Sequence, residues 1–560
     1  MRGSHGTVRW ARSDSETASS TQRHLGTCVP DPAISGSRQC EARPRRKNTV
    51  PKNAKARATT AKPASPTSVP ADADTWAGHL QVLRTPRLLS REVLAGMVTT
   101  LALIPEVISF SVIAGVDPMV SLVASVVLAV SMSFLGGRSA MVTAAAGSVA
   151  LVIAPMVKIH GVDYVLPAVL LAGLVQIAFG AAGLARLMRF IPRSVMIGFV
   201  NALGILIFAA QVPHLIGVPW LVYPLFALTL AIIAVLPRIT KAVPAPLVAI
   251  VVVTAVAVAA GLDVPDVAGE GPMNGGLPGL TPFLVPLNLE TLQIIWPTAL
   301  SVAFVGLLET LLTAKLVDDL TDTRSHKTRE SWALGVANML AGLYGGIAGC
   351  AMIGQTVVNV KIGRARTRLS TLAAGLLLLL LITSLSTVMG KIPMVALAAV
   401  MMVVAVATVN WHSVRPATLK RMPVPETLVM VATVGVVVAT GNLALGVLAG
   451  TLLAMALFAR RVAHVINVQR KLADDGGSVA YVVTGPLFFG SSNDLVEQFS
   501  YALDPPEVSV DLSAAQIWDA SSVAAVDSVE EKFAKHGCAV NITGLDSRSR
   551  AFHAKLTGRL

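Results

Sequence analysis

A long succession of apolar runs, from about Glu92 to Arg461, sets the tightest limit on what this chain can fold into. Many of the runs reach the length of about 20 residues that a helix needs to cross roughly 30 Å of hydrocarbon. Only 14% of the residues are charged, against about 25% in soluble domains, and the deficit lies in this region. The sequence therefore predicts an α-helical polytopic membrane protein.

Proline, glycine and charged residues divide the apolar region into fourteen expected spans, with an acidic loop at about 262–290 between the seventh and the eighth. The expected spans are approximately 92–114, 118–136, 141–157, 162–185, 194–212, 219–236, 243–261, 291–317, 329–347, 350–361, 369–389, 393–409, 424–440 and 442–459. The third and the tenth are too short or too rich in glycine to cross a bilayer comfortably.

Positive charge alternates between successive loops. With the N-terminus placed in the cytoplasm, the odd-numbered loops hold only Lys158 and Lys391 as basic residues. The even-numbered loops hold Arg138; Arg186, Arg189 and Arg193; Arg238 and Lys241; Arg324, Lys327 and Arg329; Lys361, Arg364, Arg366 and Arg368; and Arg415, Lys420 and Arg421. Short cytoplasmic loops are enriched in Lys and Arg, so we expect a bacterial inner-membrane protein with both termini in the cytoplasm. Lys and Arg in the N-terminal tail and in these loops on one side of the membrane, rather than a nucleic-acid-binding surface, account for the net charge of +13.

The composition changes on both sides of the apolar region, which we assign to residues 86–470. Residues 1 to about 85 are rich in Ser, Thr, Ala, Pro, Arg and Lys and lack apolar periodicity, which indicates a disordered basic tail. Residues 477–560 alternate strands with helices, which indicates a small cytoplasmic α/β domain. Its expected strands are 479–483, 508–512 and 539–542, and its expected helices are 493–503 and 523–535.

Two carboxylates lie inside apolar spans, Glu106 in the first and Glu309 in the eighth. An acid within the membrane is costly and is a functional candidate by default, although it can also be a structural pair or reach water near a helix end. Pro105, immediately before Glu106, is expected to mark a kink.

The surroundings of the two acids repeat. About 41 residues after each acid comes a small-residue segment that opens a short span, Ala144–Ser148 in the first half and Gly345–Ala351 in the second. Seven spans make up each half, so the repeat must be inverted in the membrane. In such folds, two interrupted helices meet near the bilayer midplane, at the substrate site.

Two facing half-helices suit an anion. The free N–H groups at a helix N-terminus carry partial positive charge, and small residues let a ligand approach the backbone. Thr143, Ser148, Gln355 and Thr356 could add hydrogen bonds. The alternative for each glycine-rich segment is close helix packing, but the matched pair favours a binding site.

Four segments together resemble one known family, the SulP inorganic anion transporters, whose C-terminal part is a STAS domain. The matching segments are Leu103-Ile-Pro-Glu-Val-Ile-Ser-Phe110 with Ala114-Gly-Val-Asp-Pro118, Phe190-Ile-Pro-Arg-Ser-Val-Met-Ile-Gly-Phe199, Gly306-Leu-Leu-Glu-Thr-Leu-Leu-Thr313, and Gly345-Gly-Ile-Ala-Gly-Cys-Ala-Met-Ile-Gly-Gln-Thr-Val-Val-Asn359. The resemblance covers residues 92–560. It implies a dimer of chains with core and gate domains and an elevator-like movement.

The resemblance also implies site residues. Substrate, a sulfate- or bicarbonate-class anion, would lie between the third and tenth spans, near Gly147, Cys350 and Ala351. In sodium-dependent bicarbonate members, an acid of the eighth span and a Thr four residues later help to bind sodium, which here correspond to Glu309 and Thr313. Those members have Asp where this chain has Glu, so a co-transported proton fits at least as well. No other cofactor is implied.

The resemblance to STAS domains points to one further candidate residue, a possible phosphorylation site. Asp519-Ala-Ser-Ser522 stands where anti-sigma-factor antagonists have Asp-Ser-Ser-Gly, so Ser521 matches their phosphorylated serine. A phosphosite there would serve a regulatory protein partner. The alternative is a helix N-cap, which Asp, Ser and Thr all favour, and we prefer it for Ser521.

Other functions remain open on this fold. An anion channel, a purine- or uracil-type permease and a non-transporting membrane sensor that signals through the STAS domain are the alternatives. An enzyme is not indicated, because the sequence has no Walker loop, nucleophile elbow or metal-ligand cluster. The four cysteines have no CxxC spacing, so neither a metal site nor a disulfide framework is indicated.

Deletion of residues 1–85 is expected to leave folding and anion uptake intact, because this segment has no pattern that could bury a core. The measurement is size-exclusion chromatography and proteoliposome uptake of the truncated protein. Loss of a monodisperse dimer would contradict the expectation.

Overall fold

The computed structural model describes residues 81–557 apart from 184–185, 187–189, 240–243, 272–278, 287, 464 and 475. The predicted tail, up to residue 80, lies outside the described residues, as do Arg189 and Lys241 among the predicted loop cations.

Every predicted span has a helical counterpart. Before the acidic loop these are α2 (Pro86–Ala114), α3 (Pro118–Leu135), α4 (Gly147–His160), η1 (Val162–Tyr164) with α5 (Val165–Ala181), α6 (Arg193–Gln211) with η3 (Val212–Leu215), α7 (Val222–Ile239) and α8 (Ala245–Ala259). The short η4 (Val267–Gly269) lies in the loop. After it come α9 (Leu289–Thr321), α10 (Lys327–Gly342), α11 (Ile353–Val357) with the π-helical η5 (Val358–Ile362), α12 (Leu369–Gly390), α13 (Met394–Thr408), α16 (Val424–Thr440) and α17 (Leu443–Ala463). Two single turns, α14 (Trp411–Val414) and α15 (Pro416–Leu419), precede α16.

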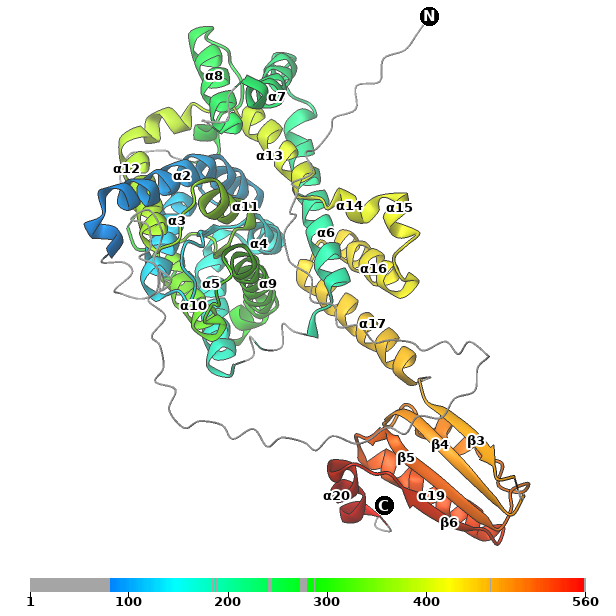
Figure 1. Cartoon of the computed structure of the whole chain (residues 1–560). Coiled ribbons are helices and arrows are strands. Elements are labelled where there is room, and N and C mark those ends of the chain that lie inside the picture. The colour runs from blue at the N-terminus through cyan, green and yellow to red at the C-terminus, as the bar shows by residue number, and fades with distance from the viewer. Residues whose placement is uncertain are drawn as a thin grey trace, which may run out of the picture. The chain divides into compact units, whose positions relative to one another are not determined.

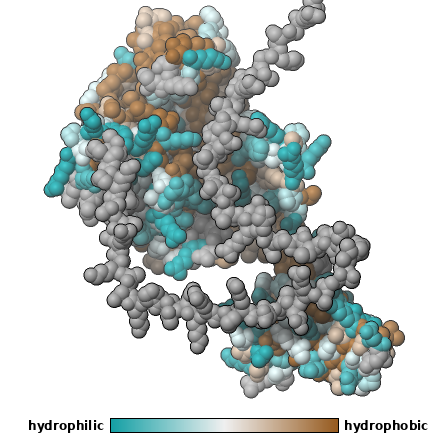
Figure 2. Space-filling view, in the orientation of Figure 1, coloured by the Kyte–Doolittle hydropathy of each residue, from teal (hydrophilic) through white to brown (hydrophobic). Residues whose placement is uncertain are grey.

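The length and apolarity of these helices fit a bilayer. Eight of the helices in the described residues are long and apolar enough to cross a membrane, and α4, α8, α13 and α16 are shorter apolar helices. Large hydrophobic side chains are exposed on the outside of the helical part, much of which is brown in Figure 2. Val235 of α7 and Val251 and Val258 of α8 are examples. Lipid rather than water is the medium that favours such a surface.

Local sequence sets the helix ends. Pro86 and Pro118 occupy first-turn positions, where the missing N–H has no cost. Gly115 ends α2 in the left-handed conformation at φ 71°, and the Asp117 carboxylate then accepts the Met119 N–H at 2.8 Å to open α3. Pro105 lies inside α2, where it removes one helical hydrogen bond just before Glu106.

The helices form two groups by their contacts. In the first group α2 packs against α3, α4 and α12, α5 packs against α9 and α10, and α3 packs against α10 and α12 (Figure 1). In the second group α6 packs against α13, α16 and α17, and α7 packs against α8 and α13. Each group therefore takes equivalent spans from both halves of the chain, as an inverted repeat with core and gate domains requires.

The C-terminal part is a four-stranded sheet in the order β3–β4–β5–β6, with β3 antiparallel to β4 and the other neighbours parallel. Its elements are β3 (Asn467–Leu472), β4 (Ser478–Leu487), α18 (Ser492–Glu497), β5 (Glu507–Ile517), α19 (Ala520–Lys535), β6 (Ala539–Thr543) and α20 (Ser547–Leu556). A core around Tyr481 and Phe533 joins the sheet to its helices. The predicted strand and helix order is confirmed, but β3 and α20 were not predicted. The sheet begins at Asn467, before the predicted boundary at 477, because a mostly exposed polar edge strand such as β3 carries no apolar signal.

The preferred N-cap assignment for Ser521 is wrong. Asp519 caps α19, and its carboxylate accepts the Ser522 N–H at 3.0 Å and the Ser522 hydroxyl at 2.7 Å. The same carboxylate accepts the Phe489 N–H at 2.6 Å, which ties the loop after β4 to the helix start. Ser521 lies in the first turn with its side chain exposed.

Asp519→Ala should destabilise α19 by about 1 kcal/mol, the usual cost of losing an N-cap carboxylate. Ser521→Ala should change its stability by less than about 0.5 kcal/mol, as is usual for an exposed side chain. Hydrogen exchange of the α19 amides in the full-length protein measures both effects, and equal protection in the two variants would contradict this assignment.

Candidate functional site

The two small-residue segments cross as a pair of short strands, β1 (Thr143–Ala145) and β2 (Gly349–Ala351). They pair antiparallel, with Thr143 opposite Ala351 and Ala145 opposite Gly349. A Cβ on Gly349 would lie 2.3 Å from the Ala144 carbonyl oxygen, so only glycine permits this approach. The strand pair was not predicted, because three-residue strands of Gly, Ala, Thr and Cys have no β-like alternation.

Each strand leads directly into a helix, β1 into α4 and β2 into α11 and η5. Since the strands are antiparallel, the two helices leave the crossing in opposite directions, and both N-termini lie beside it. The first N–H groups of a helix have no intrahelical partner and carry partial positive charge. The first backbone hydrogen bonds of α4 run from the N–H groups of Val149 and Ala150 to the Ala146 carbonyl. The N–H groups of Gly147 and Ser148, which precede them, therefore have no partner within the helix.

Glu309 of α9 lies at this crossing. Its side chain is 8% exposed and accepts a hydrogen bond from the Ser148 hydroxyl at 2.5 Å. The Cys350 thiol also bonds the carboxyl, and its sulfur lies 3.8 Å from the Ser148 oxygen. Three predicted residues, from α9, α4 and β2, therefore meet around one carboxyl, and both of its side-chain partners are neutral.

Threonines of α9 and α11 hold the strands in place. The Thr313 hydroxyl oxygen lies 2.8 Å from the carbonyl oxygens of both Glu309 and Ala351, which share its one proton, and Thr310 accepts the Ala351 N–H at 3.0 Å. Thr356 accepts the N–H of Val142, which precedes β1, at 3.0 Å. Two of the three predicted threonines, Thr313 and Thr356, thus bond backbone groups in or next to the strands.

Two more of the predicted site residues, Glu106 of α2 and Gln355 of α11, contact each other. The half-buried Glu106 carboxyl bonds the side chain of Gln355, which is buried. The Thr143 hydroxyl is buried as well and has no hydrogen-bond partner among the described residues. A buried hydroxyl without a partner is costly, which makes Thr143 a candidate to bind a ligand.

Two predicted residues have different surroundings. Gly147 faces the Phe110 ring of α2, and a Cβ on it would lie 2.5 Å from the nearest ring carbon. Ala351 turns its fully buried methyl group into a cluster with Met141 and Ala314, and its N–H and carbonyl already bond the Thr310 and Thr313 hydroxyls.

Several residues of the site were not predicted. Asn338 of α10 bonds both the N–H and the carbonyl of Gly349, and its amide also donates to Gln176 at 2.9 Å. Ser125 of α3 accepts the Ala145 N–H at 3.1 Å. Buried polar residues within apolar spans are the signal that could have found them.

An apolar helical bundle with two interrupted helices that meet beside buried acids defines the class of multi-pass membrane transporters. The chain belongs to the Sulfate permease family, whose sequence profile matches residues 89–224 and 220–433. Residues 469–557 match the STAS domain. The family is one of transporters, not of enzymes.

Two bacterial relatives have names that refer to different anions. YbaR of Bacillus subtilis (strain 168), whose name describes it provisionally as a sulfate transporter, is 47% identical over 463 residues, which cover 83% of this chain and 96% of YbaR. The bicarbonate transporter BicA of Synechocystis sp. is 27% identical over 437 residues, 71% of this chain and 76% of BicA.

Solved structures share the fold. SLC26A9 matches with a TM-score of 0.72 at 14% identity, over 85% of this chain and 88% of that one. The transmembrane domain of a cyanobacterial BicA matches with a TM-score of 0.57 at 24% identity, over 66% of this chain and 98% of that one. The helical transporter fold predicted from the sequence is thus confirmed.

Gly147→Ala should reduce anion uptake about tenfold, because its Cβ would press on the Phe110 ring and overpacking costs about 1–3 kcal/mol. Gly435→Ala, at an exposed position of α16 that the proposed site does not include, is the control, since no atom lies within 4 Å of its Cβ. Uptake of labelled sulfate and bicarbonate into proteoliposomes tests both. Similar uptake by the two variants would show that the close contact at Gly147 is not required.

Proposed function

We propose that this protein is a secondary active transporter of a small inorganic anion of the sulfate or bicarbonate class in the bacterial inner membrane. The anion binds at the N-terminal ends of α4 and α11, and a proton or a sodium ion moves with it. The observation that carries the proposal is the contact of the buried Glu309 carboxyl with Ser148, the second residue of α4. This contact places a titratable group beside a helix N-terminus that favours anions.

The crossing offers an anion several donors. They are the first N–H groups of the two helices, the unpartnered Thr143 hydroxyl and the Gln355 amide. The described residues that form the crossing include no Lys or Arg, so helix N-termini would supply the positive potential.

Glu309 supplies the coupling. Its hydrogen-bonding partners are a hydroxyl and a thiol, and neither offsets a full negative charge in a site removed from water. An anion that enters beside an ionised Glu309 would also meet like-charge repulsion. Uptake of a proton or a cation by Glu309 removes both costs, so the anion and the coupling ion load together.

Whether the coupling ion is a proton or sodium depends on how many oxygen ligands surround Glu309. The one hydroxyl proton of Thr313 is shared by two backbone carbonyls, which leaves the oxygen lone pairs to face a cation. A proton needs only the carboxyl itself. Sodium would need several oxygen ligands, which Glu309, Thr313 and neighbouring carbonyls would have to supply.

Further parts of the proposal come from the relatives and from the loops. The family description and the name of YbaR point to sulfate, whereas BicA carries bicarbonate in its name. The charge alternation of the loops supports cytoplasmic termini. We also keep a homodimer and a regulatory partner at the exposed Ser521 as proposals, the latter because an exposed first-turn serine is accessible to a kinase.

Glu309→Gln should abolish the response of uptake to an imposed proton gradient and strongly weaken the response to a sodium gradient, because a neutral amide does not take up a proton near neutral pH and offers a cation no negative charge. Downhill anion exchange should survive, since the amide adds no charge beside the anion. Glu309→Asp should have a milder effect on gradient-driven uptake and should shift the preferred coupling ion towards sodium. The measurement is proteoliposome uptake of sulfate and bicarbonate under inward proton and inward sodium gradients.

Glu290→Gln is the matched control, because Glu290 is an exposed acid in the first turn of the same helix. It should respond to gradients like the wild type. Gradient-driven accumulation of the anion by Glu309→Gln would show that Glu309 is structural and direct the search to Glu106.

A further inference from the structure

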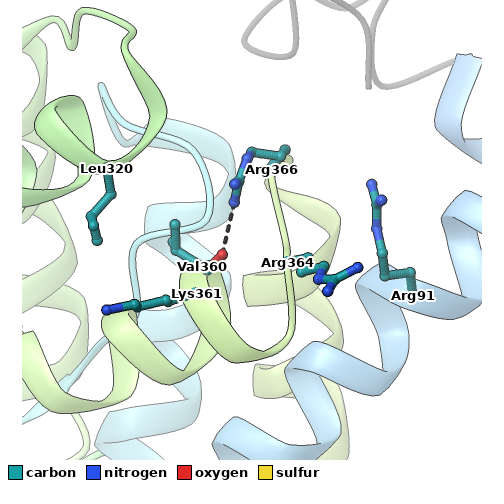
Figure 3. A pocket seen from close by; sticks show the side chains of 6 residues that line it. All are labelled: Arg91, Leu320, Val360, Lys361, Arg364 and Arg366. Atoms are coloured by element: carbon teal, nitrogen blue, oxygen red, sulfur yellow. Dashed lines mark hydrogen bonds between the residues drawn. The ribbon is translucent and has the colours of Figure 1, made fainter. Parts of the chain in front are cut away.

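A basic pocket of about 290 Å³ lies at the helix ends, apart from the crossing. It is lined by Arg91 of α2, Leu320 of α9, Val360 and Lys361 of η5, and Arg364 and Arg366 of the loop before α12 (Figure 3). Figure 3 shows Arg364 extending from this loop towards the part of α2 that carries Arg91. Four of the six lining residues are cations and none is an acid.

Two acids close in sequence to the lining residues, Glu92 and Asp318, have partners of their own. The Glu92 carboxylate accepts the N–H groups of Arg366 and Thr367 and the Thr367 hydroxyl, at 2.9–3.2 Å. Asp318 of α9 forms an ion pair with Arg138 at 3.3 Å. The pocket therefore keeps an excess of positive charge that these two acids offset only in part.

The pocket cations also have donors to spare. Nε and Nη2 of Arg91 are buried without a hydrogen-bond partner among the described residues, whereas Arg366 uses Nη1 on the carbonyls of Val360 and Ala365, both at 2.8 Å. Burial, and to a smaller extent the neighbouring Arg91, lowers the pKa of Arg366. Arg364 adopts a left-handed backbone at φ 56°, uncommon for a residue with a side chain and often found at functional sites.

We propose that this pocket binds the phosphate-like oxyanion group of an anionic ligand, supplied by a phospholipid headgroup or by a free inorganic anion. Guanidinium groups match the geometry of phosphate oxygens, and a volume of about 290 Å³ exceeds the roughly 30 Å³ of a water molecule by enough to admit such a group. Arg91 lies near the start of α2 and Leu320 near the end of α9, so the pocket is at headgroup level.

A ligand here would bridge the elements that carry the proposed transport site. α2 carries Glu106, α9 carries Glu309, and η5 continues the helix of Gln355. The bound oxyanion would hold the ends of these elements together by neutralising cations that otherwise repel. It would be a regulatory ligand rather than the transported anion, because its site is separate from the strand crossing.

The test uses the full-length protein in nanodiscs under three conditions: phosphatidylcholine alone, phosphatidylcholine with phosphatidylglycerol, and phosphatidylcholine with inorganic phosphate. Native mass spectrometry counts retained phosphatidylglycerol, and the shift in melting temperature reports phosphate binding. Arg91→Gln with Arg364→Gln should weaken binding of the responding probe about 30-fold, from about 1 kcal/mol per cation. Arg415→Gln with Lys420→Gln, two exposed cations of the α14–α15 segment, is the charge-matched control.

A response to phosphatidylglycerol alone would identify the lipid headgroup as the source, and a response to phosphate would identify the free anion. Equal binding by wild type and the Arg91–Arg364 variant, or an equal loss in the control variant, would overturn the proposal. If the double variant does not fold, Arg364→Gln carries the test, because that side chain is exposed and its loss should still weaken binding about fivefold.

Discussion

The pairing of β1 with β2 is the interaction on which the rest of the transporter depends. Backbone polar groups within a membrane must be satisfied by protein, and extended segments are tolerated there only when other elements surround them. Here the strands satisfy one another, and Ser125, Thr310, Thr356 and Asn338 bond the remaining groups. This hydrogen bonding permits two helices to begin inside the protein, where their N-termini can face a ligand.

The charges are arranged around this crossing in a consistent way. Acids without a cationic partner lie at the crossing, where Glu309 bonds a hydroxyl and a thiol and Glu106 bonds an amide. The described cations gather at the helix ends, where Arg138 pairs with Asp318 and Arg91 lines the basic pocket. Positive potential near the crossing therefore comes from backbone dipoles, which cannot be lost by deprotonation.

Much of this architecture could be predicted from the sequence, because apolar length and loop charge are signals of the chain itself. The two acids and the small segments 41 residues after them indicated the candidate site for the same reason. The contact of Phe110 with Gly147 and the pairing of Ala145 with Gly349 could not be predicted, since they depend on how distant spans pack. Asp519 rather than Ser521 is the cap because its backbone, at φ −144° and ψ 175°, is extended, a conformation that composition does not reveal.

The strand pair also has a consequence for biosynthesis. β1 belongs to the first half of the chain and β2 to the second, so the ribosome delivers them far apart in time. Until Gly349–Ala351 has been made, the β1 groups that pair with it have no partner within the nascent protein. The first seven spans can enter the bilayer in order, but the crossing closes only after the ninth span has followed. The first half must therefore wait in an unfinished form, open to water or to the insertion machinery.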